Sequence, residues 1–98
     1  MDDSVIMQPG TGASNSQDFG VEGNKRVTVQ LYPYANLGAD TAALMRKAPD
    51  GTYVQCYDDV GEIILSATRP QEVVLGQGTY RLEAAARTAA WGASKNSG

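Results

Sequence analysis

The sequence contains no histidine and only one cysteine, Cys56. Without histidine, the chain lacks the side chain that most often serves as a general base or a metal ligand near neutral pH. A single cysteine excludes an intramolecular disulfide, whereas short chains in an oxidising environment often carry paired cysteines. We therefore expect synthesis and assembly in the cytoplasm, and we expect no enzyme activity, no cofactor and no bound metal.

Positive charge is also scarce. The 98 residues include 8 Lys and Arg against 11 Asp and Glu, which gives a formal net charge of −3. The only adjacent basic pairs are Lys25-Arg26 and Arg46-Lys47. Proteins that bind nucleic acid or an anionic membrane need a basic face. We therefore expect neither direct nucleic-acid binding nor membrane binding.

Long apolar runs are missing from the chain. The N-terminal stretch MDDSVIMQPG begins with acidic residues and has no apolar run of signal-peptide length. No stretch approaches the roughly 20 apolar residues that a membrane-spanning helix requires. The expectation is a soluble, unprocessed protein.

Large aromatic side chains are few, because Phe19 is the only Phe and Trp91 is the only Trp. A chain of this length forms one small domain. In a domain this small, the burial of apolar surface barely offsets the entropy lost on folding. Contact with a partner or with further copies would add stability, so we expect a homo-oligomer.

Alternating apolar and polar residues predict short strands, most clearly in KRVTVQLY at residues 25–32. Residues 41–48 also favour a helix, but the following Pro49-Asp50-Gly51 is a typical turn and indicates a hairpin with residues 52–57. On the second strand of this hairpin, Val54 and Cys56 are expected to face the core. The predicted strands cover residues 25–32, 41–48, 52–57, 62–68, 72–75, 79–84 and 89–93.

Strands at this spacing predict an all-β fold, a small antiparallel β-sandwich or barrel of six to seven short strands with a flexible N-terminal arm. The segment EVVLGQGTYRLEA indicates a hairpin that turns at Gly76-Gln77-Gly78, with Tyr80 and Leu82 on one face and Thr79 and Arg81 on the other. We expect the Tyr80 hydroxyl to bond to the backbone. The alternative for residues 83–91 is a helical turn, because alanine is frequent there.

Residues 1–24 are rich in Gly, Ser, Asn and Gln, so we expect a flexible arm before a β domain at 25–94 and a frayed end at 95–98. The arm is either without consequence or docks on a neighbouring subunit. In the second case its apolar residues are the candidate anchors: Val5, Ile6, Met7, Phe19 and Val21.

Candidate chemistry is limited. Cys56 has no histidine to activate it, so we interpret it as a small core residue. Asp58, Asp59 and Glu62 are either a solvated turn or carboxylates that gather around a cation. Tyrosines offer a second candidate surface, which could bind a sugar or a protein if the first strand and the hairpin pair. These are Tyr32, Tyr34, Tyr53 and Tyr57.

Three stretches resemble small β-domain virion proteins of tailed bacteriophages, which decorate or cement a head or sit on the tail. They are Val27-Thr28-Val29-Gln30-Leu31, Asp50-Gly51-Thr52-Tyr53 and Leu75-Gly76-Gln77-Gly78-Thr79-Tyr80-Arg81. The Ala-rich residues 84–90 depart from the pattern.

The resemblance implies a non-enzymatic structural protein of the virion, assembled in the host cytoplasm. Its partner would be the major capsid protein or another virion protein, and it would bind across capsomer joints while its arm pairs with neighbouring chains. Head and tail locations both stay open. The alternative function is a carbohydrate- or protein-binding β module that uses the tyrosine-rich face.

Overall fold

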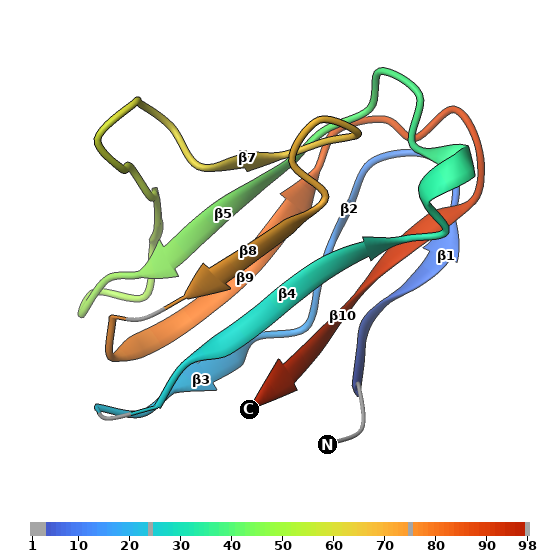
Figure 1. The fold of residues 1–98 in the computed structure, drawn as a ribbon. Helices are drawn as coiled ribbons and strands as arrows, with labels where there is room; N and C mark the ends of the chain where they lie inside the picture. The colour runs from blue at the N-terminus through green and yellow to red at the C-terminus, as the bar shows by residue number, and fades with distance from the viewer. Residues whose placement is uncertain (1–3, 24, 75, 98) are drawn as a thin grey trace.

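The computed structural model describes residues 4–23, 25–74 and 76–97. In these residues, two antiparallel sheets pack face to face (Figure 1). The strands are β1 (Ser4–Gly10), β2 (Ser14–Asn15), β3 (Phe19–Val21), β4 (Val27–Tyr32), β5 (Ala42–Lys47), β6 (Tyr53–Gln55), β7 (Ile64–Leu65), β8 (Gln71–Val74), β9 (Gly78–Ala84) and β10 (Trp91–Ser97). The predicted all-β sandwich is confirmed.

The first sheet, which we call the β4 sheet, has the strand order β1-β10-β4-β8. In the second, the β9 sheet, β9 pairs with β5 on one side and with β2 and β3 on the other, while β6 and β7 both pair with β5. The seven strands expected after residue 25 correspond to β4–β10. Val27, Val29 and Leu31 point between the sheets and are buried, as their alternation predicted.

The expected N-terminal arm requires a correction. Residues 4–10 form β1 at one edge of the β4 sheet, and residues 14–15 and 19–21 pair with β9. Ile6, Met7, Phe19 and Val21 all belong to the hydrophobic core. These apolar residues are enough to anchor the segment, and its glycines allow the turns between the short strands. Residues 1–3 lie outside the described residues.

The predicted hairpin of β5 and β6 is confirmed. The Gly51 amide donates to the Ala48 carbonyl at 2.9 Å, and Gly51 has φ of +91°, a conformation that favours glycine. The Asp50 carboxylate accepts hydrogen bonds from the amide and the hydroxyl of Thr52. The strand interpretation of residues 41–48 therefore holds, and the helical alternative does not.

The predicted hairpin around Gly76-Gln77-Gly78 is wrong. Strand β8 pairs with β4, whereas β9 pairs with β5, so this glycine-rich connection crosses from one sheet to the other. Tyr80 and Leu82 do share one face as expected, and both are buried in the core. The Tyr80 hydroxyl donates to the Gly76 carbonyl at 2.7 Å, which confirms the predicted backbone contact.

The C-terminal strand begins later and extends further than expected. Trp91 opens β10, and Lys95 and Asn96 pair with Val29 and Thr28, so the expectation of fraying from residue 95 is wrong for the described residues. Gly98 lies outside them. Residues 85–90 form no helix. Trp91 is fully buried in the core.

Candidate binding site at the open edge of the sandwich

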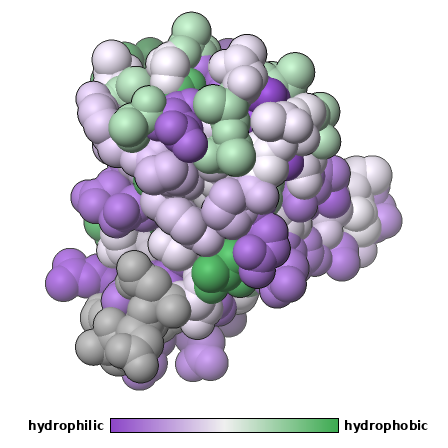
Figure 2. Space-filling model, turned by 90° about the vertical axis from the view of Figure 1, so that its right-hand side faces the viewer, coloured by the Kyte–Doolittle hydropathy of each residue, from purple (hydrophilic) through white to green (hydrophobic). Residues whose placement is uncertain are grey.

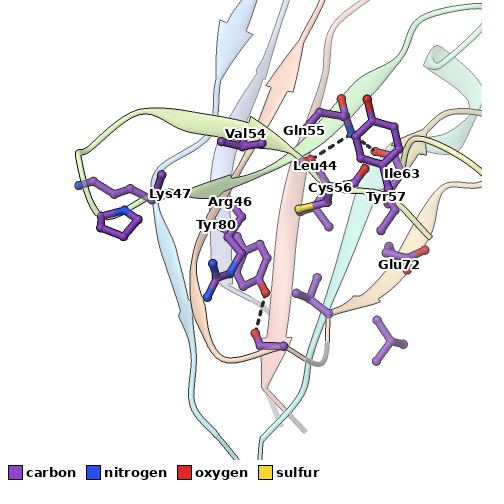
Figure 3. A pocket seen from close by; sticks show the side chains of 15 residues that line it. Leu44, Arg46, Lys47, Val54, Gln55, Cys56, Tyr57, Ile63, Glu72 and Tyr80 are labelled. Carbon is purple, nitrogen blue, oxygen red and sulfur yellow. Dashed lines mark hydrogen bonds between the residues drawn. The ribbon is translucent and has the colours of Figure 1, made fainter.

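The two sheets leave an open side. There each sheet ends in an edge strand that pairs with a neighbouring strand on one side only. The β4 sheet ends at β8 and the β9 sheet ends at β6, on the left of Figure 1. Between these edges lies a hollow of about 510 Å³ (Figure 3). We call this hollow the seam. The side chains that matter most in the seam are Leu44, Arg46, Val54, Cys56, Tyr57 and Glu72.

The floor of the seam is an uncovered part of the inner face of the β9 sheet. Leu44 is buried on that face, and Arg46, two residues later, lies on the same face of β5. Val54 is the register partner of Arg46, so its side chain also faces inward. Nevertheless, Val54 is 55% exposed. The expected inward orientation is right, but the β4 sheet ends before it covers this valine.

One end of the seam carries positive charge. The Arg46 guanidinium donates to the Gln77 carbonyl at 2.7 Å and lies 5.9 Å from the centre of the Tyr80 ring. Lys47 follows it on β5 but is the register partner of Tyr53, so its side chain lies on the outer face of the β9 sheet. Figure 3 shows the Arg46 guanidinium beside Tyr80, away from Tyr57 and Glu72. The Lys47 ammonium lies 4.0 Å from the Asp18 carboxylate, and both side chains are substantially exposed. The cation inside this end of the seam is therefore Arg46, whereas Lys47 lies at its outer rim.

The other end carries carboxylates. Glu72 is the register partner of the buried Val29, so it points inward from the edge strand β8. Arg69 binds Glu72 at 2.6 Å and Asp58 at 2.8 Å. Hydrogen bonds to Asp58 from the Val60 amide and then from Arg69 hold the pKa of Asp58 below its usual value.

Exposed apolar side chains concentrate around the seam. Among the described residues, the large hydrophobic side chains that are exposed are Val5, Tyr34, Val54, Tyr57, Val60 and Val73. Three of them line the seam, and Val60 lies in the adjoining loop between β6 and β7. By contrast, the right-hand side of the molecule is mainly hydrophilic or neutral, with strongly hydrophobic colour limited to small areas (Figure 2). Clustered exposed apolar side chains indicate an interaction surface.

Cys56 lies half-buried in the seam and packs against the core. Burial raises the pKa of its thiol, and the nearby Arg46 offsets this only in part. The protonated thiol is therefore favoured at neutral pH, which does not suit a nucleophile. The described part of the chain contains no group of three or more Cys, Asp or Glu side chains that could hold a metal ion.

The four candidate tyrosines do not form one face. Tyr32 ends β4 in one sheet, and Tyr34 begins the short 3₁₀ helix η1 (Tyr34–Asn36). Tyr53 lies on β6 in the other sheet. Tyr57 lines the seam. The condition for a tyrosine surface was pairing between the first strand and the hairpin, and β4 and β5–β6 belong to different sheets.

Tyr53 instead takes part in a polar cluster on the outer face of the β9 sheet. Its hydroxyl donates to the Asp18 carboxylate at 2.8 Å, and the Arg81 guanidinium lies 3.6 Å from the centre of its ring. The hydrogen bond to Asp18 raises the pKa of Tyr53. Arg81 also binds Glu83 at 2.6 Å. With its charges paired in this way, the cluster links β6 to the segment before β3.

The predicted anchors of the arm are also divided. Ile6, Met7, Phe19 and Val21 are buried in the core of this chain, and only Val5 is exposed, at 43%. Sequence reasoning missed Val60, Val73 and the two charged ends of the seam. Their role depends on which strands form the sheet edges, and the sequence pattern does not contain that information.

A scan of protein-family models, a search of curated proteins and a search of solved structures each found no match to this chain. Within the described residues, no helix has the length and apolar character needed to cross a membrane.

Proposed function

We propose that this chain is a non-enzymatic structural protein of a tailed-bacteriophage particle, most specifically a head decoration or cement protein, and that it binds through the seam. The observation that carries the binding role is the exposure of Val54, an inward-facing apolar residue on a sheet that its partner sheet does not cover. The assignment to a phage particle comes from the resemblance of the three β motifs.

The seam suits a structural role because it combines an apolar floor with charged ends. Buried apolar anchors supply most of the affinity of a protein interface, while rim charges fix its orientation. A shell-stabilising protein works through many copies of a modest interface and needs no reactive group. The protonated state favoured for the Cys56 thiol agrees with binding and not with nucleophilic catalysis.

The alternative of a carbohydrate- or protein-binding module was based on a shared tyrosine face. Tyr34 and Tyr57 are both well exposed, but they lie on elements attached to different sheets. Sugar-binding aromatic surfaces need rings that a single ligand can reach together. The divided positions of the tyrosines therefore favour the structural role.

The test is quantitative mass spectrometry of particles purified by density gradient from a lysate of the source strain after infection or prophage induction. The proposal predicts that the chain co-purifies with the particle at a fixed ratio to the major shell protein. Particles that lack the chain should lose their contents at lower temperature than complete particles. Finding the chain only among unassembled proteins would contradict the proposal.

A further inference from the structure

We propose that the seam is a self-association surface, on which a second copy of this chain docks about a two-fold axis. This inference rests on one part of the proposed function, namely that the seam binds protein. It does not depend on the assignment to a phage particle. The argument comes from the charges, the exposed apolar residues and the edge strand of the seam.

The charges at the two ends of the seam are complementary. Arg46 is exposed at one end, and the loop between β6 and β7 carries the exposed Asp59 and Glu62 beside the other end, where Tyr57 and Glu72 lie (Figure 3). A two-fold axis through the seam turns one copy end over end relative to the other. The basic end of each copy then faces the acidic loop of its partner, as a self-complementary interface requires.

The same loop presents an apolar residue to the partner. Val60 is 95% exposed, and the loop that holds it is well ordered by hydrogen bonds. The Asp58 carboxylate accepts from the amides of Val60 at 2.9 Å and Gly61 at 3.1 Å. Because Arg69 also holds Asp58, the loop is preorganised and little entropy is lost on docking.

The hollow that would receive Val60 is present in the same molecule. Val54 and Cys56 form its apolar floor, and Arg46 stands at its basic end. Docking of Val60 there covers Val54, which the β4 sheet leaves exposed. In the same arrangement Asp59 approaches Arg46. Each copy supplies one protruding loop and one hollow, so both of these contacts form twice.

The edge strand favours a closed dimer over an open-ended sheet. The Pro70 carbonyl accepts from the Leu31 amide at 2.9 Å, so the backbone groups of Gln71 and Val73 point to the free edge. Glu72 points inward from this edge and is held by Arg69. Inward-pointing charges on edge strands oppose indiscriminate strand pairing. Docking through the Val60 loop covers the exposed apolar surface of the seam without adding a strand to the sheet.

The first test is cross-linking between position 60 and Cys56 in full-length chains that carry Val60→Cys. Unlabelled and ¹⁵N-labelled copies are mixed and oxidised with diamide, which takes up the two electrons and two protons released by the thiols. We expect peptides joined between position 60 of one isotope and Cys56 of the other. Ala13→Cys places an exposed thiol on the loop between β1 and β2 and serves as the control.

Mixed-isotope links between position 60 and Cys56 that are no more frequent than links between position 13 and Cys56 would overturn the proposal. Links between chains divide between mixed and single isotopes, whereas links within one chain carry a single isotope. Single-isotope links in large excess over mixed ones would therefore count against the proposal as well. Because Val60 is almost fully exposed, the substitution leaves the fold intact, which circular dichroism verifies.

The second test is a charge reversal measured by sedimentation equilibrium. Arg46→Glu and Asp59→Arg should each weaken the dimer roughly tenfold, because the altered contact occurs twice, and the double variant should restore it. Unchanged association in both single variants, or no recovery in the double variant, would contradict the two-fold arrangement. If self-association fails while seam variants are still excluded from particles, the proposed function survives and only this inference falls.

Discussion

The indole N–H of Trp91 donates a hydrogen bond of 2.9 Å to the carboxylate of Asp40, and both side chains are buried. Asp40 also accepts from the amide of Thr88 at 2.8 Å. The carboxylate therefore joins the loop before β5 to the start of β10. These hydrogen bonds, that of Trp91 foremost, hold the pKa of Asp40 below its usual value.

Asp40→Ala should lower the melting temperature by several degrees, because it leaves the buried indole N–H of Trp91 without its acceptor. Thermal unfolding followed by circular dichroism measures the change. Glu22→Ala removes an exposed carboxylate outside the seam and is the matched control. Equal melting temperatures for the two variants would show that the contact between Asp40 and Trp91 adds no stability.

The stability of the chain should fall in acid through Asp40, Asp50 and Asp58, whose pKa values are all lowered by hydrogen bonds. Because their pKa values are lower in the folded chain, the unfolded chain takes up protons first. Their contribution is present above the ordinary value of 3.8 and is lost as pH falls through the folded values below it. Denaturant unfolding between pH 6 and pH 2 measures this loss, and Asp40→Asn should make it shallower. An unchanged slope in that variant would exclude Asp40 as a contributor.

Arg87→Met should destabilise the chain by about 2 kcal/mol or more, because hydrogen bonds to a charged group are lost. The buried guanidinium donates to the carbonyls of Trp91 at 2.6 Å and Gly12 at 2.9 Å, and so holds the turn after β1 against β10. The exposed Arg26 provides the control, Arg26→Met. Urea unfolding should separate the two variants, and coincident curves would refute a structural role for Arg87.

Gly92→Ala should be strongly destabilising, whereas Gly20→Ala should be close to neutral. A Cβ atom at Gly92 would overlap the backbone of Met7 and Pro9, which cannot move without displacing β1 from β10. Nothing lies within 4 Å of a Cβ atom built at Gly20. The free energies of unfolding of the two variants test the placement of β1. Similar values would mean that β1 does not pass this close to β10.

A chain that begins at Lys25 should fail to fold cooperatively. It lacks β1, β2 and β3 and with them the buried Ile6, Met7, Phe19 and Val21. The near-ultraviolet circular dichroism of Trp91 reports the packed core, and its signal should be absent. Adding residues 1–24 as a separate peptide should restore part of it. A cooperative transition in the shortened chain alone would show that residues 1–24 are a dispensable arm and not part of the folded domain.

The sequence predicted the strands after residue 25 because their side chains alternate clearly, as in Val27, Val29 and Leu31. It did not predict β1–β3, because glycine and small polar residues around them outweighed a few apolar residues such as Phe19. It also gave no sign that Gly76-Gln77-Gly78 crosses between sheets, because a turn sequence constrains local angles and not the choice of pairing partner. The seam was missed for the same reason. The exposure of Val54 follows from where the opposite sheet ends.

The central claim is that this chain binds its partners through the seam, and competitive incorporation into particles tests it most directly. Particles that lack the chain are given equal amounts of tagged wild-type and variant chains, and the bound ratio is measured by mass spectrometry. Val54→Asp places a charge in the seam, and Val5→Asp places one on an exposed valine of β1. We predict that Val54→Asp is largely excluded while Val5→Asp competes as well as the wild type. Equal incorporation of Val54→Asp and wild type would contradict the account.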